Sequence, residues 1–385
     1  MIRTANGLPV VVFITILTLS ALYAPQPLLP LLASEFQISR DMAASLTTIA
    51  FLPLCIAPLL YGRILSAFTP RQLLRGAIPV LAVTELLFPL CSTVWALFAV
   101  RLLQGLMIPA ILTAMMTYVS TECAPGEIRR TMGIYIASTI LGGLLGRTMS
   151  GTIATLLGWH YSFYLLGGSL LLGFLLLGLL APGSPPQGVR PKGQILTILR
   201  DKGARRTYIT VFCMFFVFAA IMNYLPFRVA ELDAAATEMR IGFMYSGYLL
   251  GIVSALNAVR LTSLLGGTSR TMMLGLAGLI VALIGMLVPN TTPLFFFMFP
   301  FCGAMFLVHS VASGHLNSLG LENRGMVNGL YVAFYYGGGM LGSSLPGPIY
   351  QHFGWPAFIS LLAVLTGGGI LAASGLQSPH TKTDQ

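Results

Sequence analysis

The stretch GIYIASTILGGLLGRTMSG at residues 133–151 has a counterpart in the same chain, GLYVAFYYGGGMLGSSLPG at residues 329–347. The two stretches align at a constant spacing of 196 residues. The identical pairs are Gly133/Gly329, Tyr135/Tyr331, Ala137/Ala333, Gly142/Gly338, Gly143/Gly339, Leu145/Leu341, Gly146/Gly342 and Gly151/Gly347. The same spacing relates Gly158-Trp159 to Gly354-Trp355, and Pro30 to Pro226. This shared register indicates an internal duplication.

The composition around this repeat is that of a membrane protein. Of the 385 residues, 56% are hydrophobic and 8% are charged, whereas a soluble protein has about 25% charged residues. So few charges cannot cover a water-soluble domain of this size. The composition therefore excludes a disordered chain, a disulfide scaffold and a nucleic-acid-binding domain, despite a net charge of +10. The five scattered cysteines show no metal-ligand spacing, so we expect no metal site.

Twelve stretches are long and apolar enough to cross a bilayer, which takes about 20 residues. The first six lie near 8–33, 44–66, 73–92, 94–120, 131–157 and 161–181, and the second six near 207–229, 242–260, 271–289, 293–317, 327–350 and 355–376. A Pro- and Gly-rich, then basic, segment separates them. We therefore expect an all-α membrane protein with an N-terminal six-helix bundle, a cytoplasmic linker and a C-terminal six-helix bundle ending in a short cytoplasmic tail, at 1–181, 182–206 and 207–385.

The basic residues predict the orientation of the chain. With the N-terminus inside, sixteen of the 21 Lys and Arg residues fall in cytoplasmic segments and three in outer loops. Because cytoplasmic loops carry an excess of positive charge, both termini are predicted to be cytoplasmic. The apolar run after Arg3 is too long for a signal peptide and leads straight into further spans. We expect a multi-pass protein of the inner membrane.

An even number of spans per half gives both halves the same orientation, as in transporters built from parallel repeats. The residues YAPQPLLPLLASEF (23–36), RLLQG (101–105), GIYIASTILGGLLGR (133–147) and NYLPFR (223–228) add a family likeness. In them the chain resembles the major facilitator superfamily over essentially its whole length, and most closely its efflux branch of drug:proton antiporters and sugar-efflux permeases. The resemblance implies two pseudo-symmetric bundles that transport by alternating access.

The resemblance also implies gating residues. The family's loop between spans 2 and 3 contains Gly-x-x-x-Asp, but here Ser66 takes the place of the Asp, which leaves Gly62, Arg63 and Arg71 as candidates. The glycines of spans 5 and 11 are expected to pack against spans 8 and 2. Close helix packing without a gating role is the simpler reading of these glycines; they are Gly142, Gly143, Gly146, Gly338, Gly339 and Gly342.

Three ionisable residues lie inside spans of the first half: Glu85, Arg101 and Arg147. A charge at a helix centre costs about 2.5–3.5 kcal/mol on insertion scales, so each should find a partner. Glu85 and Arg101 flank the turn between spans 3 and 4 and are predicted to pair about 11–13 Å below the outer surface. Arg101, with Gln104, either forms part of a substrate site or braces backbone carbonyls, as the family's R-x-x-Q-G motif is thought to do. A substrate that displaces an arginine from Glu85 would leave this carboxylate free to take up a proton.

Other polar side chains at membrane depth are candidate substrate contacts. Tyr23 and Gln26 lie among prolines that should kink span 1, and Asn223 and Tyr224 occupy the related part of span 7. His309 is either a proton shuttle or a hydrogen-bonded structural residue. Tyr331 and Tyr335 either stack on a substrate or simply pack.

These observations predict a monomeric secondary transporter that exports a small molecule using the proton gradient. Its partners are the substrate, protons and the lipid bilayer, without nucleic acid or cofactor. The absence of a Walker A loop excludes direct ATP use. An anionic metabolite, a carboxylate or a siderophore-like molecule, is the alternative cargo, because two buried arginines outnumber one buried acid. A membrane-embedded enzyme or receptor is disfavoured because the acidic residues do not cluster.

Overall fold

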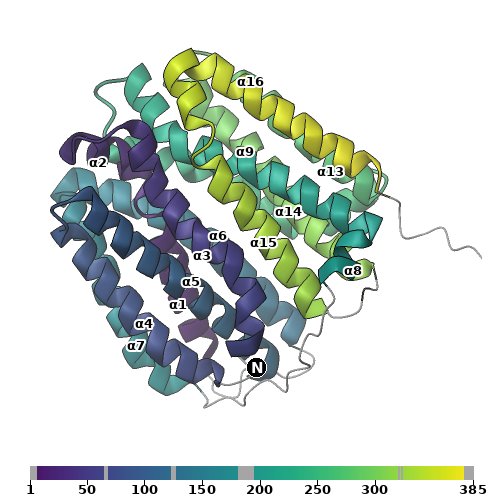
Figure 1. Ribbon diagram of the computed structural model, residues 1–385, viewed down its shortest axis with the longest axis horizontal. Coiled ribbons are helices and arrows are strands. Elements are labelled where there is room, and N and C mark those ends of the chain that lie inside the picture. The colour runs from purple at the N-terminus through teal and green to yellow at the C-terminus, as the bar shows by residue number, and fades with distance from the viewer. Residues whose placement is uncertain are drawn as a thin grey trace, which may run out of the picture. The chain divides into compact units, whose positions relative to one another are not determined.

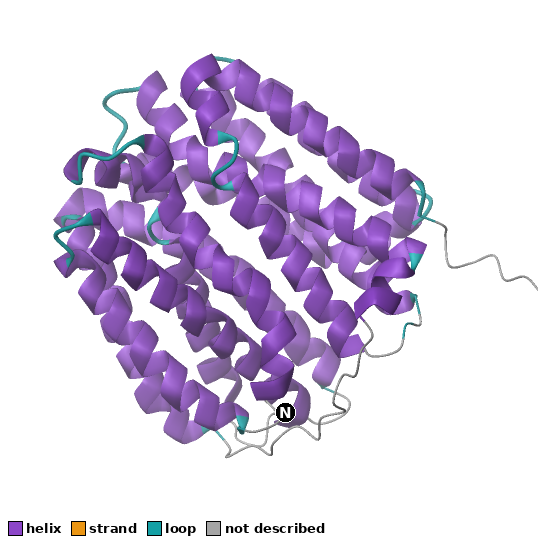
Figure 2. Cartoon of the chain, in the orientation of Figure 1, coloured by secondary structure: helices purple, strands orange, loops and turns teal. Residues whose placement is uncertain are grey.

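A computed structural model describes residues 7–64, 68–122, 127–180, 195–319, 321 and 324–376. Every regular element in these ranges is a helix (Figure 2), which confirms the all-helical prediction. Residues 182–194 of the predicted linker lie outside the described residues. Its last part contains the short helix α8 (Ile195–Arg200).

The chain forms two compact units. Unit 1 comprises Met1–Arg190 with Ala235–Tyr245, and unit 2 comprises Pro191–Ala234 with Ser246–Gln385. The helices of unit 1 (Figure 1) are α1 (Gly7–Tyr23), η1 (Gln26–Leu28), α2 (Leu29–Glu35), α3 (Arg40–Ile64), α4 (Pro70–Leu87), η2 (Phe88–Leu90), α5 (Val94–Glu122), α6 (Ile128–Leu157), α7 (Trp159–Leu176), η3 (Leu177–Leu179) and α10 (Glu238–Met244).

In unit 2, α9 (Lys202–Leu232) packs against the last two helices of the chain. Between unit 1 and unit 2 the chain passes through η4 (Tyr245–Gly247). The other helices of unit 2 are α11 (Tyr248–Leu256), α12 (Ala258–Leu264), α13 (Thr268–Gly285), α14 (Thr291–Ser318), α15 (Arg324–Gly342) and α16 (Gly347–Ser374).

Eleven helical segments among the described residues are long and apolar enough to cross a membrane. They coincide with eleven of the predicted spans. The remaining predicted span, 327–350, corresponds to α15, which ends at Gly342, before α16 begins at Gly347. Turn residues therefore interrupt the helix where the sequence predicts a continuous span.

The predicted kink in span 1 is confirmed. The span consists of α1, the short helix η1 and α2, and the break falls at Pro25 and Pro27. Proline lacks the N–H that continues a helix. In unit 2, by contrast, α9 continues through Pro226 without a break.

The sequence repeat is also a repeat of contacts. A Cβ added to Gly142 would meet the carbonyl of Ile16 on α1 at 2.6 Å, and one added to Gly338 would meet the carbonyl of Phe212 on α9 at 2.3 Å. Gly146 lies in the same way against Ser20, and Gly342 against Phe216. Each pair of contacts is related by the spacing of 196 residues. These glycines therefore bring the fifth span of each half against its own first span. The packing of span 5 against span 8 that the family resemblance implies is present as well, because α10 packs on α6.

The same spacing extends to the Gly-Trp pairs, where backbone geometry requires glycine. Gly158, between α6 and α7, has a φ of 101°, and Gly354, inside α16, has a φ of 77°. Such positive values strain a residue with a side chain. At Gly354 the helix kinks, and Trp355 begins the part that follows.

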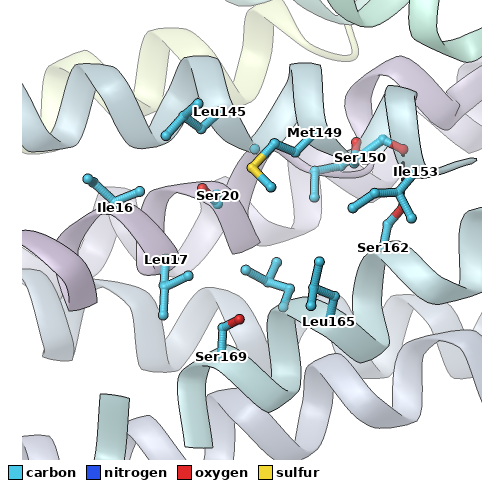
Figure 3. A pocket seen from close by; sticks show the side chains of 13 residues that line it. Ile16, Leu17, Ser20, Leu145, Met149, Ser150, Ile153, Ser162, Leu165 and Ser169 are labelled. Carbon is cyan, nitrogen blue, oxygen red and sulfur yellow. Dashed lines mark hydrogen bonds between the residues drawn. The ribbon is translucent and has the colours of Figure 1, made fainter. Parts of the chain in front are cut away.

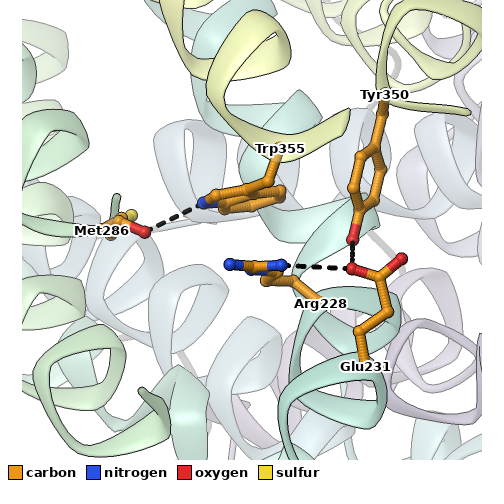
Figure 4. Close-up of polar contacts among 5 residues, drawn as sticks. All are labelled: Arg228, Glu231, Met286, Tyr350 and Trp355. Carbon is orange, nitrogen blue, oxygen red and sulfur yellow. Dashed lines mark hydrogen bonds and ion pairs between the residues drawn. The ribbon is translucent and has the colours of Figure 1, made fainter. Parts of the chain in front are cut away.

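The glutamates Glu35 and Glu231, which the same spacing relates, have different partners in the two units. In unit 1, Trp159 Nε1 donates to Glu35 Oε2 at 2.6 Å. In unit 2 the corresponding Glu231 accepts from the Tyr350 hydroxyl at 2.6 Å and from Arg228 Nη1 at 3.3 Å (Figure 4). The Arg228 guanidinium lies 5.6 Å from the Trp355 ring centroid, and Trp355 Nε1 donates to the Met286 carbonyl. This cluster joins α9, α16 and the residue after α13.

We expect Tyr350→Phe to lower the free energy of unfolding by about 1–2 kcal/mol, because it removes a hydrogen bond to a partly exposed carboxylate. Thermal unfolding of the purified protein measures the change. Tyr161→Phe is the matched control, because Tyr161 is 56% exposed. Equal melting temperatures for the two variants would contradict a structural role of the Tyr350 hydroxyl.

Candidate functional site

Arg101 on α5 completes the hydrogen bonding at the break in span 1. In an α-helix each carbonyl accepts from the N–H four residues later, so Pro25 leaves the carbonyl of Ala21 without its helical donor. Arg101 Nη1 donates to this carbonyl at 3.1 Å, and Nη2 donates to that of Leu22 at 2.8 Å. The Ser150 hydroxyl of α6 donates to the Ala24 carbonyl at 2.6 Å. The broken segment is therefore held from α5 and α6.

The remaining donors of Arg101 also reach neutral acceptors. Nε donates to the Leu46 carbonyl on α3 at 3.2 Å, and Nη1 to Gln104 Oε1 at 2.7 Å. Arg101 and Gln104 are both fully buried. These contacts match the bracing role considered for Arg101, and a direct substrate contact stays a prediction.

The expected ion pair between Glu85 and Arg101 is not formed. Glu85 on α4 is fully buried, and neither of its carboxylate oxygens has a hydrogen-bond partner among the described residues. The prediction was wrong because the break in span 1 supplies carbonyl acceptors that take the donors of Arg101. Glu85 is left as a buried acid with no compensating donor in the described part of the chain.

Arg147 on α6 lies between two aromatic rings. Its Cζ is 4.0 Å from the ring centroid of Tyr23 and 5.0 Å from that of Tyr245. Nε donates to Gln26 Oε1 at 2.6 Å and Nη1 to the Gly143 carbonyl at 2.6 Å. The structure thus brings together Tyr23, Gln26 and Arg147, three of the residues that the sequence singled out.

Tyr245 was missed by the sequence reasoning. It directly follows α10, far from Arg147 in sequence, and it is fully buried. The spacing of 196 residues gives no signal, because the position related to Tyr245 in the first half is Ile49. Only the packing of α10 on α6 reveals the contact.

A separate apolar opening of about 100 Å³ lies between α1, α6 and α7 (Figure 3). Three of its serines donate their hydroxyls to backbone carbonyls: Ser20 to Gly142, Ser150 to Ala24 and Ser162 to Ser150. Neither Glu85 nor Arg147 lines it. The opening therefore has the character of helix packing, with no charged group among its lining residues to bind a polar substrate.

In unit 2, His309 on α14 lies against two tyrosines of α15. The Tyr331 hydroxyl is 2.8 Å from His309 Nδ1 and 3.0 Å from the His309 carbonyl. The ring centroid of Tyr335 lies 4.9 Å from that of His309 and 3.6 Å from that of Phe215 on α9, on which it stacks. The structure thus groups His309, Tyr331 and Tyr335 on one aromatic face, and the His309–Tyr331 contact matches the hydrogen-bonded structural histidine considered from the sequence, while the proton shuttle stays a prediction.

The pair Asn223 and Tyr224 contacts the turn that follows α15. Asn223 Nδ2 donates to the Ser343 carbonyl at 2.9 Å, and the Tyr224 hydroxyl to that of Ser344 at 3.4 Å. Ser343 is the repeat counterpart of Arg147. In both units, therefore, the proline-containing first span makes a polar contact with the related position of the fifth, Arg147 or Ser343, although Gln26 and Asn223 are one residue out of register.

The sequence profile described as Major Facilitator Superfamily matches residues 11–320. The chain belongs to this superfamily. Like its relatives, it is a membrane transporter and not an enzyme.

Two bacterial relatives of this superfamily cover nearly the whole chain. The Inner membrane transport protein YnfM of Escherichia coli (strain K12) is 26% identical over 357 residues, which are 90% of this chain and 85% of that protein. The uncharacterized MFS-type transporter YybF of Bacillus subtilis (strain 168) is 22% identical over 373 residues, 93% of this chain and 91% of that protein.

Solved structures of superfamily transporters show the same fold. A bacterial homolog of the human lysosomal transporter Spinster, inward-facing and occupied, has a TM-score of 0.74 at 14% identity, covering 96% of this chain and 93% of that one. A mutant of the nucleoside transporter NupG has a TM-score of 0.79 at 13% identity, covering 96% and 98%. At these identities the likeness shows the fold alone.

Of the superfamily's expected gate residues, Arg71 can be placed. Its Nη2 donates to the Gly178 carbonyl in η3 at 3.2 Å, within unit 1. The side chains at Gly62 and Arg63 lie outside the described part of the chain, as does Ser66. Among the residues that the structure describes, no group of three His, Cys, Asp or Glu could hold a metal ion.

Proposed function

We propose that this superfamily transporter is a proton-coupled exporter of a small molecule, with Glu85 as the proton-carrying group. The observation that carries the proposal is the environment of Glu85, which is fully buried with no hydrogen bond to either oxygen among the described residues. An ionised carboxylate in such a place loses its hydration without compensation, whereas the protonated, neutral form carries a much smaller cost. Ionisable residues inside the membrane generally mark transport pathways or proton relays.

The proposed coupling step is not the displacement of an arginine from Glu85 that the sequence suggested. Because Arg101 donates to backbone carbonyls and to Gln104, no ion pair has to be broken before Glu85 takes up a proton. Glu85 would instead exchange its proton when a change of conformation hydrates it. The substrate then acts on the conformational change and not on the charge of Glu85 directly.

Arg147 is the proposed substrate contact. Its guanidinium is framed by Tyr23, Tyr245 and the Gln26 amide. A planar guanidinium recognises carboxylate and phosphate groups through paired hydrogen bonds. This favours a cargo with an anionic group and agrees with the alternative of an anionic metabolite. We further propose a monomer in the inner membrane with both termini in the cytoplasm, from the distribution of basic residues.

Transport by purified protein in liposomes with an imposed pH gradient tests this function. A panel of small carboxylates and of neutral and cationic compounds is added, and a fluorescent pH indicator inside the liposomes reports proton movement. We expect anionic compounds to drive saturable proton flux. Substrate flux that ignores the gradient would overturn proton coupling, and flux of cationic compounds alone would overturn the role of Arg147.

A further inference from the structure

The Arg147 guanidinium is closed off from any ligand in this structure. Arg147 is 1% exposed, and the Tyr23 and Tyr245 side chains beside it are 8% and 0% exposed. The two ring centroids lie 4.0 and 5.0 Å from Arg147 Cζ. If Arg147 binds substrate, as the proposed function holds, one of these aromatic side chains must first move away.

Tyr23 lies in a span, Gly7–Glu35, that belongs to unit 1 over its whole length. It ends α1, whose backbone is in close contact with Gly142 and Gly146 of α6. Arg101 and Ser150 further hold the carbonyls on either side of Tyr23, at Leu22 and Ala24. Moving Tyr23 would therefore disturb a close helix contact and two buried hydrogen bonds of unit 1.

Tyr245 stands at a point where the chain leaves unit 1. It follows the seven-residue helix α10 and begins η4, after which the chain belongs to unit 2. Two glycines allow α10 to lie directly on α6. A Cβ on Gly151 would meet the Glu238 carbonyl at 2.3 Å, and one on Gly242 would meet the Arg147 carbonyl at 2.9 Å.

Polar contacts hold the first turn of α10 in addition. Thr155 Oγ1 accepts from the backbone N–H of Met239 at 2.9 Å and lies 3.3 Å from Glu238 Oε2. At the other end of this short helix, the Tyr245 ring makes a cation–π contact with Arg147. Unlike α1, the segment that carries α10 is joined along the chain to unit 2 at both of its ends, at Ala234 and at Ser246, so it can be displaced from α6 as a segment.

We infer that Tyr245 is a positioning residue that covers Arg147 and ties α10 to α6 until an anionic group takes its place. The cation–π contact holds the arginine side chain in the closed arrangement while the site is empty. An anion that engages the guanidinium competes with the ring for Arg147, and this releases α10. The inference rests on the proposed function only in naming the anion; the cover itself is independent of it.

Chemical labelling of arginine tests the cover without a known substrate. The purified native protein and its Tyr245→Leu and Tyr245→Phe variants are treated with phenylglyoxal, and peptide mass spectrometry measures the modification rates of Arg147 and Arg101. Loss of the ring contact in Tyr245→Leu should raise the rate at Arg147 about tenfold. Tyr245→Phe keeps the ring and should label like the native protein. Arg101, equally buried but covered by other helices, should label slowly throughout.

Two results would overturn the inference. One is an Arg147 rate that does not respond to Tyr245→Leu. The other is a rise at Arg101 equal to that at Arg147, since this indicates general loosening in place of an opened cover.

A second variant separates the cover from the tyrosine itself. Gly151→Ala places a methyl group against the Glu238 backbone and should push α10 from α6, raising Arg147 labelling with Tyr245 intact. Gly133→Ala is the matched control on the same helix, because a Cβ there has nothing within 4 Å. Equal Arg147 labelling in the two alanine variants contradicts the inference. If labelling follows expectation while transport proves independent of Arg147, the cover stands and the proposed function fails.

Discussion

Replacing Arg101 with methionine is expected to destabilise the protein by about 1–3 kcal/mol for each buried carbonyl that loses its donor. The variant leaves the carbonyls of Ala21 and Leu22 without the arginine donors at the break in span 1. Arg101→Lys should lose nearly as much, because an ammonium group cannot reproduce the planar fork that serves several acceptors at once. The thermal stability of both variants is measured in detergent, as the temperature at which the monodisperse species is lost.

Arg75→Met is the matched control for this experiment, since Arg75 is exposed on α4. The comparison also decides between the two roles considered for Arg101. A brace predicts an unstable protein, whereas a substrate contact alone predicts a stable protein that has lost transport. Native stability of Arg101→Met would therefore contradict the structural reading.

The repeat register was the most informative signal in the sequence. The spacing of 196 residues predicts which helices correspond, and the structure adds that corresponding glycines contact corresponding residues. Gly142 lies on Ile16 as Gly338 lies on Phe212. The contacts repeat because a glycine on a duplicated helix meets the same partner position in both copies.

Span boundaries do not predict the direction in which a side chain points around its helix axis. Counting residues from a turn gives the depth of Glu85 and Arg101, but depth does not decide which neighbour each faces. The sequence contained the missing clue in Pro25, since a proline frees a carbonyl that must find a donor elsewhere. Arg101 meets that need, and Glu85 was left without the expected partner.

Contacts between segments distant in sequence were equally out of reach. Tyr245 approaches Arg147 because α10 packs on α6, and no motif records this packing. The carboxylates at Glu35 and Glu231 were missed for another reason. Their alignment at the same spacing as the Gly-Trp pairs was visible, but acidic residues near span ends are common enough to pass unnoticed.

Replacing Glu85 with glutamine is expected to abolish transport driven by the pH gradient while leaving the protein folded. Glutamine has nearly the same shape and cannot exchange a proton. Since the Glu85 oxygens have no hydrogen-bond partner among the described residues, no such contact is lost. Glu85→Leu should even raise the free energy of unfolding by about 1–3 kcal/mol, because it removes a buried polar group that lacks a partner.

Measuring both stability and transport of the Glu85 variants separates a role in folding from a role in proton exchange. A residue kept for folding should cost stability when replaced, whereas a residue kept for proton exchange should cost function while stability stays level or rises. Glu122→Gln is the control, because Glu122 is also buried but lies at the last residue of α5. Liposomes containing each variant are given the same inward proton gradient, and substrate flux is compared with and without it. If gradient-driven flux in Glu85→Gln equals that of the native protein, Glu85 does not carry the proton. His309 would then be the next residue to replace, because its Nδ1 lies 2.8 Å from the Tyr331 hydroxyl.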